Sequence, residues 1–170
     1  MKQRPWFERA FPFPVDPASA PEILARLRGT PARLDELLRD PDVNALIAKP
    51  DGAWSAQENV GHLWDLEPLW LGRLEDFLSG ADELRTADLR NRKTYEALHN
   101  KASPRALLIE FRKARTTFVA RLESLNENDW KRAARHPRLQ QPMTVTDHAF
   151  FVAEHDDNHL ARIAELLTGP

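Results

Sequence analysis

Two histidines lie four residues apart near the end of the chain, within the stretch AEHDDNHLARI at residues 153–163. Positions i and i+4 share one face of an α-helix, so His155 and His159 could hold one metal ion from a single helix. Their acidic neighbours would equally suit the solvated face of a surface helix. A third ligand at the same depth in the fold would decide between these two interpretations.

His62 is the strongest candidate for that third ligand. It lies seven residues after Ser55, which opens a helical segment, and His159 lies eight residues before Leu167, where the last helical segment ends. At 1.5 Å per residue both histidines are roughly 10 to 12 Å from a helix end, so antiparallel packing would bring the three imidazoles together. Sites with three protein ligands keep a coordination position open for water or substrate, and they are usually catalytic.

The elements that must position these residues are helical. Apolar residues recur at helical spacing in four segments, and no strand-like alternation of useful length competes with them. The segments cover residues 21–39, 55–79, 103–125 and 144–167. The predicted fold class is therefore all-α, and a four-helix bundle is the economical architecture.

Helix ends are marked by local signals. Ser55-Ala-Gln-Glu58 is a capping box, Ser103-Pro104 combines a cap with an N1 proline, and Thr144-Val-Thr-Asp147 is a similar start. The last helix is expected to end at Gly169-Pro170. Inside the first segment, Gly29-Thr30-Pro31 predicts a kink or a short break.

The connections between the helices are long. Residues 80–103 form a polar link, with a short helix expected around 91–100. This link is long enough to return along the bundle, so the second and third helices could run parallel. Residues 126–143 are also long for a hairpin, so loop length alone does not determine the topology.

Composition limits the function. A chain of 170 residues is most simply one domain, here 1–170 with an extended aromatic arm at about 1–17. A net charge of -2 argues against general nucleic-acid binding, and the lack of Cys excludes a thiolate ligand or nucleophile. No signal peptide is recognised, and no apolar run approaches the roughly 18 to 20 residues of a membrane span. We expect a cytoplasmic protein.

Together these residues resemble the DinB-like (damage-inducible B) superfamily. The pattern is Trp54-Ser55-x-x-Glu58-x-x-x-His62-Leu63, followed about ninety residues later by His155-x-x-x-His159-x-x-x-Ile163, and the resemblance spans nearly the whole chain. Relatives in the superfamily include bacillithiol S-transferases and mycothiol-dependent maleylpyruvate isomerases. The superfamily's name refers to gene induction and does not imply DNA binding.

The resemblance implies a four-helix bundle in up-down-down-up order, with the long link joining parallel second and third helices. It also implies a divalent metal ion, nickel or zinc above all, held by His62, His155 and His159. Many relatives have another His directly before the last ligand, where this chain has Asn158. Because family members often pair through helical faces and the arm is rich in aromatic residues, we also expect a homodimer.

Four more residues could belong to the site. Glu58, one turn before His62, could be a general base or only the capping-box residue. Asp65, one turn after His62, could orient that ligand or face solvent. Asn158 and Arg162 flank the last ligand and could line the mouth of a pocket.

The other candidates are weaker. His148 shares a face with the histidine pair and is expected at the end of the bundle or in the pocket. His99 and His136 lie in loops, where they would be structural or exposed to solvent. Trp64 and Trp70 fit the core better than a substrate platform. Four basic residues precede the last helix: Lys131, Arg132, Arg135 and Arg138. They could form a solvated loop, or they could bind the anionic group of a carboxylated thiol.

The predicted function is metal-dependent transfer that uses a low-molecular-weight thiol as cosubstrate. Three neutral imidazoles would leave the ion its full charge, which lowers the pKa of a bound thiol or water. The chain has no Cys, so the thiol and the electrophile would both be small-molecule substrates. A metal-dependent hydrolase and a non-catalytic metal-binding stress protein are the alternatives.

Overall fold

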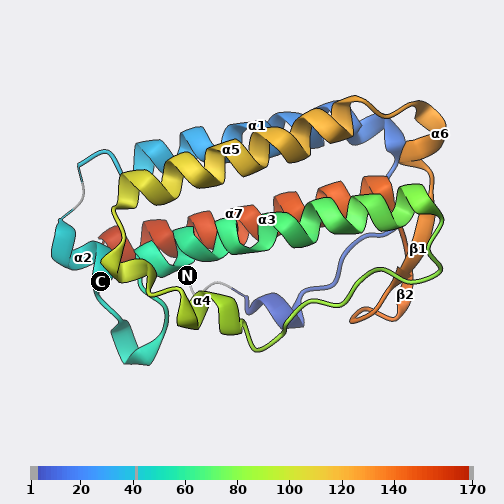
Figure 1. Ribbon diagram of the computed structural model, residues 1–170. Helices are drawn as coiled ribbons and strands as arrows, with labels where there is room; N and C mark the ends of the chain where they lie inside the picture. Colours follow the sequence, from blue (N-terminus) through green and yellow to red (C-terminus); the bar gives the residue numbers. More distant parts are fainter. Residues whose placement is uncertain (1–3, 41, 169–170) are drawn as a thin grey trace.

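Four long helices form a bundle in the computed structural model, which describes residues 4–40 and 42–168 (Figure 1). They are α1 (Ala20–Leu37), α3 (Ala56–Ser79), α5 (Pro104–Glu123) and α7 (Val145–Thr168). Shorter helices occupy the connections: α2 (Val43–Ile47), α4 (Arg92–Glu96), α6 (Glu127–Trp130), and the 3-10 turns η1 (Trp6–Glu8), η2 (Pro17–Ser19), η3 (Pro50–Gly52) and η4 (His99–Lys101). The predicted all-α four-helix bundle is confirmed. None of the described helices has the length and apolar character needed to cross a membrane.

The predicted helix starts correspond to hydrogen-bonded caps. The Ser55 side chain accepts from the Glu58 N–H while the Glu58 carboxylate accepts from the Ser55 N–H, which is a complete capping box. Thr144 and Asp147 exchange similar bonds ahead of α7. At its other end, α3 stops at Gly80 in a left-handed conformation. Residues 169–170, predicted to end the last helix, lie outside the described part of the chain.

Of the kink or short break predicted at Gly29-Thr30-Pro31, the break does not occur, since α1 is continuous from Ala20 to Leu37. A proline inside a helix leaves the carbonyl of residue i−4 without its usual N–H donor. Here that carbonyl belongs to Leu27, and it lies 3.5 Å from Nη1 of the buried Arg115. A side chain of α5 thus replaces the missing donor.

A short β-hairpin is an addition to the predicted all-helical pattern. Strand β1 (Ala133–His136) pairs antiparallel with β2 (Gln141–Thr144) just before α7. Each strand has only four residues, too few for alternation to be recognised in the sequence. The hairpin holds the long link, since the Leu84 N–H donates to the Arg135 carbonyl.

Helices α3 and α7 run antiparallel. Near the start of α3, Asn59 contacts His159 of α7. Three turns further along α3, the Trp70 carbonyl contacts His148, which lies earlier in α7. This direction places His62 and the pair on α7 at the same level of the bundle.

Helices α3 and α5 run parallel, because Arg115 binds Glu67 and, further along both helices, Arg121 binds Glu75. The colours in Figure 1 show α1 and α7 running in the opposite direction, which gives an up-down-down-up order. The link between α3 and α5 returns along one side of the bundle and carries α4 (Figure 1). Thr94 of this link contacts His62, so the link covers the face of α3 on which His62 lies.

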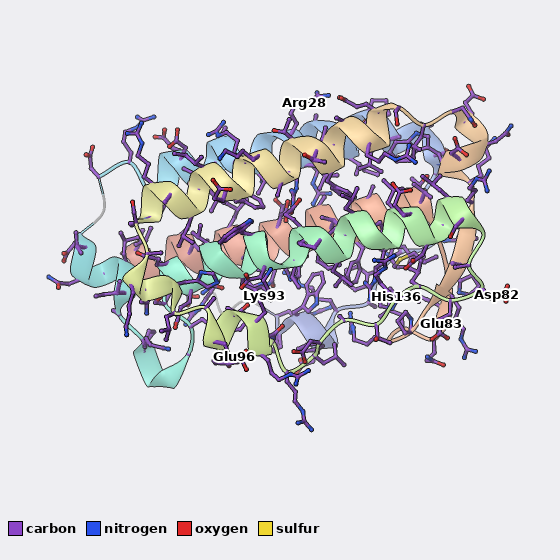
Figure 2. The ribbon with its side chains drawn as sticks, viewed as in Figure 1. Arg28, Asp82, Glu83, Lys93, Glu96 and His136 are labelled. Atoms are coloured by element: carbon purple, nitrogen blue, oxygen red, sulfur yellow. The ribbon has the colours of Figure 1, made fainter. Side chains whose placement is uncertain are left out.

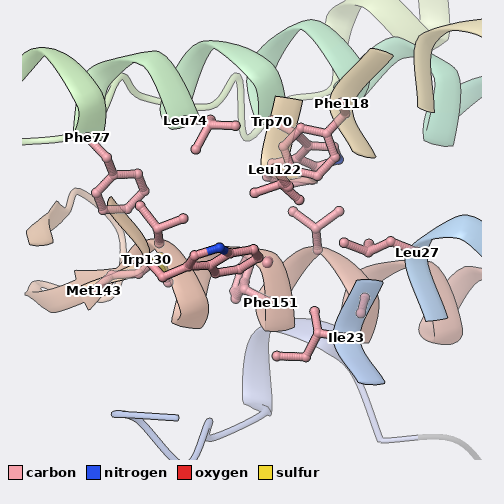
Figure 3. Packing of buried hydrophobic residues seen from close by; sticks show 14 of the residues in the cluster. Ile23, Leu27, Trp70, Leu74, Phe77, Phe118, Leu122, Trp130, Met143 and Phe151 are labelled. Carbon is pink, nitrogen blue, oxygen red and sulfur yellow. The ribbon is translucent and has the colours of Figure 1, made fainter. Parts of the chain in front are cut away.

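The interior contains two apolar clusters with a charged layer between them. Figure 3 shows the cluster nearer the hairpin, where Leu27 and Phe118 pack with Leu74 of α3. The second cluster is formed by residues near the other end of the bundle. Each long helix contributes one polar residue to the layer: Thr30, Glu67, Arg115 and Asp156, all buried.

Candidate metal centre

The structure brings the three predicted histidines together. His62 of α3 and His155 and His159 of α7 are buried, and one ligand atom from each lies within 4.8 Å of the others. The closest pair is Nε2 of His155 and Nε2 of His159, at 3.2 Å. Such an arrangement has the donor type and spacing of a three-histidine metal site.

The orientation of His62 is set by a chain of buried hydrogen bonds. Its Nδ1 lies 3.0 Å from the Thr94 hydroxyl oxygen, which itself donates to the Asp65 carboxylate at 2.9 Å. Because the Thr94 proton goes to Asp65, the Thr94 oxygen accepts the Nδ1–H of His62. The lone pair of His62 is therefore on Nε2, the remaining ring nitrogen.

Asp65 is kept ionised by its neighbours. Burial opposes the charge, but hydrogen bonds from His99 and Thr94 outweigh it and hold the Asp65 pKa below its usual value. His99 Nε2 lies 2.8 Å from the same carboxylate oxygen that accepts from Thr94. The predicted orienting role of Asp65 is thus exerted through Thr94 rather than by direct contact with the ligand.

The orientation of His159 is set in a similar way by Asn59. Nδ2 of Asn59 donates to the Ser55 carbonyl at 2.8 Å, which fixes which end of the amide carries the oxygen. The Asn59 Oδ1 then accepts from the Nδ1–H of His159, also at 2.8 Å. The Nε2 atom of His159 consequently carries a lone pair directed toward His155.

Burial also keeps the three imidazoles neutral. It is the largest cause that lowers the pKa of His62 to about 2 and of His159 to about 4, and it lowers that of His155 well below the usual value. A neutral imidazole is the form that binds metal. Hydrogen bonds at Nδ1 leave the Nε2 lone pairs of His62 and His159 available, and His155 supplies a third neutral imidazole. Such a donor set fits a divalent ion such as zinc or nickel.

The histidines open into a cavity of about 310 Å³, which is the size of a small-molecule site. Trp54 lies against His62, with ring centroids 4.5 Å apart, and Trp6 of the arm lies against His155 at 5.1 Å. Asn158 lines the cavity, as the sequence predicts. The walls come from α3, α7, the long link, the hairpin and the arm.

Two predicted site residues lie elsewhere. Glu58 is in the capping box, where one carboxylate oxygen accepts from the Ser55 N–H and the other binds Lys49. It is not among the residues that line the cavity, and these contacts support the capping interpretation. Arg162 is also absent from the lining, because its guanidinium binds Glu165 one turn along α7.

The remaining histidines are all buried, so the solvent-exposed alternative for His99 and His136 is wrong. His148 lies in the core and donates from Nε2 to the Trp70 carbonyl at 3.0 Å. His136 points from β1 into the cavity on the side of the bundle covered by the link (Figure 2). Trp70 is both a core residue and part of the cavity wall.

The basic segment before α7 has two parts. Arg132 and Arg135 are exposed and bind Asp129 and Gln140 respectively. Arg138, at the hairpin turn, lines the cavity. Of the four basic residues, it is the one that a ligand in the cavity could contact.

Three residues of the site were not found from the sequence. Asn59 lies one turn before His62, a spacing that could have identified it. Thr94 comes from the long link, and no local pattern indicates its approach to α3. Arg73, which lines the far end of the cavity, looks like an ordinary surface residue of an amphipathic helix.

Comparisons with known proteins support the same fold. A solved structure of YfiT from Bacillus subtilis superposes with a TM-score of 0.80, at 22% identity, over 94% of this chain and 91% of that chain. YfiT is described as "a probable metal-dependent hydrolase with an unusual four-helix bundle topology". A comparison with curated protein sequences finds no match. The family model of the DinB superfamily matches residues 13–163, and the chain therefore belongs to that superfamily.

Proposed function

We propose that this protein is a metal-dependent enzyme that transfers a small thiol to an electrophile in the cavity beside His62, His155 and His159. The main support is the pair of hydrogen bonds at Nδ1 that leave the Nε2 lone pairs of His62 and His159 available to an ion. An ion bound by three neutral imidazoles keeps its charge and lowers the pKa of a thiol or water bound to it.

The cavity wall favours a thiol over water as the nucleophile. Among the described lining residues, Asp88 is the only carboxylate, and it is occupied by hydrogen bonds from Arg90 and Arg92. No free carboxylate therefore lines the cavity in the described part of the chain. A thiol has a pKa of about 8.5 against about 15.7 for water, so it needs far less help to ionise.

The second candidate is a metal-dependent hydrolase, which the description of YfiT favours. Water would then take the place of the thiol in the same cavity. The two functions differ in one requirement. A transferase consumes thiol and electrophile together, whereas a hydrolase turns over with no thiol present.

Metal analysis of protein purified without a histidine tag tests the site itself. Replacing His62, His155 or His159 by Ala should remove most of the bound metal while the helical circular dichroism is retained. His136→Gln is the matched control, because His136 lines the same cavity but is outside the three-histidine group. Full metal occupancy in the double variant His155→Ala/His159→Ala would refute the proposal.

The reaction is tested with metal-loaded protein and a panel of low-molecular-weight thiols and electrophiles. Loss of both reactants, only when metal is present, is the expected result. Turnover of the electrophile without thiol would establish the hydrolase instead. No activity in either assay would favour a non-catalytic metal-binding protein.

A further inference from the structure

The end of the cavity away from the histidines contains two arginines. Arg73 of α3 is only 2% exposed, and Arg138 projects from the hairpin turn. The Arg138 guanidinium lies over the rings of Phe7 and Phe151, with its carbon 5.3 and 5.9 Å from their centroids. Both guanidinium groups are thus part of the otherwise largely apolar wall of the cavity.

Neither arginine is engaged in an ion pair, although the Asp76 charge acts on Arg73 from a distance. Within the described residues, no carboxylate lies within 4.0 Å of either guanidinium, and the nearby Asp76 is bound to Arg85 instead. Burial lowers the pKa of both groups, for Arg73 to about 10. Arg73 donates from Nε to the Arg85 carbonyl at 3.1 Å but has no ion pair, and burying a cation in this state is costly.

Arg138 also has an unsatisfied donor. Its Nη2 atom is buried and has no hydrogen-bond partner among the described residues. The indole Nε1 atoms of Trp54 and Trp70, two other residues of the cavity wall, are in the same condition. All three are N–H groups that can only donate, so the missing partner must be an acceptor.

His136 adds another donor beside the two arginines. Its Nδ1 accepts from the backbone N–H groups of Arg138 and Leu139, at 3.2 and 3.1 Å, so its proton is on Nε2. That Nε2 lies 3.1 Å from Nη1 of Arg73, which is also a donor. Two donors therefore face each other with no acceptor between them.

We propose that Arg138 and Arg73, together with His136, bind the carboxylate of a small acidic substrate whose other end reaches the three histidines. An oxyanion in this position would accept from Nη2 of Arg138 and Nε2 of His136 and neutralise the cations, and a guanidinium binds carboxylate in a forked geometry. This inference rests on the proposed function for the reacting end of the substrate. The carboxylate site itself depends on no metal.

The dimensions of the cavity define the substrate further. Arg73 follows His62 by eleven residues on α3, which corresponds to about 16 Å along the helix axis. The wall between them is apolar and includes Leu66, Leu69 and Trp70. The substrate class is therefore an acid with an apolar segment between its carboxylate and its reacting group.

Binding to chelator-treated protein tests the carboxylate site separately from metal chemistry. Hexanoate and its neutral analogue hexanamide are titrated while the fluorescence of the cavity tryptophans is followed, with calorimetry as a second measurement. We expect hexanoate to bind about 10-fold to 100-fold more tightly than hexanamide, the range for a hydrogen bond to a charged group. Equal affinity of the two ligands for the wild-type protein would overturn the inference.

Two variants locate the site. Arg138→Gln should remove the preference for hexanoate, and Arg138→Lys should keep part of it. Arg135→Gln is the matched control, because Arg135 lies on the same hairpin but is exposed and bound to Gln140. The same loss in Arg138→Gln and Arg135→Gln would contradict the assignment.

Metal content of Arg138→Gln should equal that of the wild type. If the wild-type protein prefers hexanoate but binds no metal, the proposed function is refuted and the carboxylate site is retained. If it binds metal but shows no preference for hexanoate, the carboxylate site is refuted and the proposed function is retained.

Discussion

Asn59 Oδ1 lies 2.8 Å from His159 Nδ1, and the Asn59 amide is held in that orientation by the Ser55 carbonyl. The cap that starts α3 therefore also determines which nitrogen of His159 faces the centre. Ser55 thus takes part both in the helix cap and in the orientation of His159.

Asn59→Leu should lower metal affinity about 10-fold to 100-fold, the usual effect of removing a hydrogen-bond partner of a metal-ligating histidine. Asn59→Asp keeps the acceptor for His159 and loses the donor to Ser55, so it should retain most of the affinity. Competition titration with a metal-binding dye measures both variants. Equal affinities in the Leu and Asp variants would show that Asn59 does not act through this acceptor.

Variants of Glu58 distinguish its role as a capping-box residue from a role as general base. Glu58→Ala removes half of the capping box and should lower the free energy of unfolding by about 1 kcal/mol, while Glu58→Gln should cost less because Gln also completes the box. Both variants should keep metal content, and turnover should stay within about 3-fold of the wild type. A loss of about 100-fold or more in Glu58→Gln would restore the general-base role.

His148 should make stability depend on pH. Burial is the largest cause that lowers its pKa to about 3, so the folded protein leaves it neutral where the unfolded chain, with a pKa near 6.5, binds a proton. Stability from this residue is therefore complete above about pH 6.5 and decreases as the pH falls from there toward 3.

His148→Leu should remove that contribution. The slope of unfolding free energy against pH, between about pH 4.5 and 6, should decrease by about 1.4 kcal/mol per pH unit. Urea denaturation in the presence of a chelator gives the slope without a contribution from metal. Identical slopes for variant and wild type would rule out a neutral buried His148.

Arg115 should be essential for the charged layer. It binds Glu67 and Asp156 and has almost no exposed surface, so Arg115→Leu would leave two buried carboxyl groups without their cation. We expect a loss of about 3 to 5 kcal/mol in denaturant unfolding. The exposed Arg112 on the same helix is the control, and Arg112→Leu should cost less than about 1 kcal/mol. Similar losses for both variants would mean that the layer contributes little.

Local signals explain what could be predicted from the sequence. The caps at Ser55, Ser103 and Thr144 depend on residues three positions apart, and the spacing of His155 and His159 depends on one helical face. Counting from the caps was enough to place His62 at the right level.

The features that escaped prediction depend on distant segments. Thr94 reaches His62 only because the long link folds back over α3, and Arg73 and Arg138 meet only because the hairpin packs against that helix. The donor that reaches the Leu27 carbonyl ahead of Pro31 comes from Arg115 of another helix. None of these contacts leaves a periodic pattern in its own segment.

The charged layer also controls alignment along the bundle axis. Asp156 is the immediate neighbour of His155, and Glu67 follows His62 by five residues on α3. Arg115 binds both carboxylates, so sliding either helix by a single residue, about 1.5 Å, would pull one of them away from its cation. The charged layer therefore disfavours packings in which one helix is shifted along the other. The three histidines stay at one level because the buried ion pairs of Arg115, close to them along α3 and α7, would be broken by such a shift.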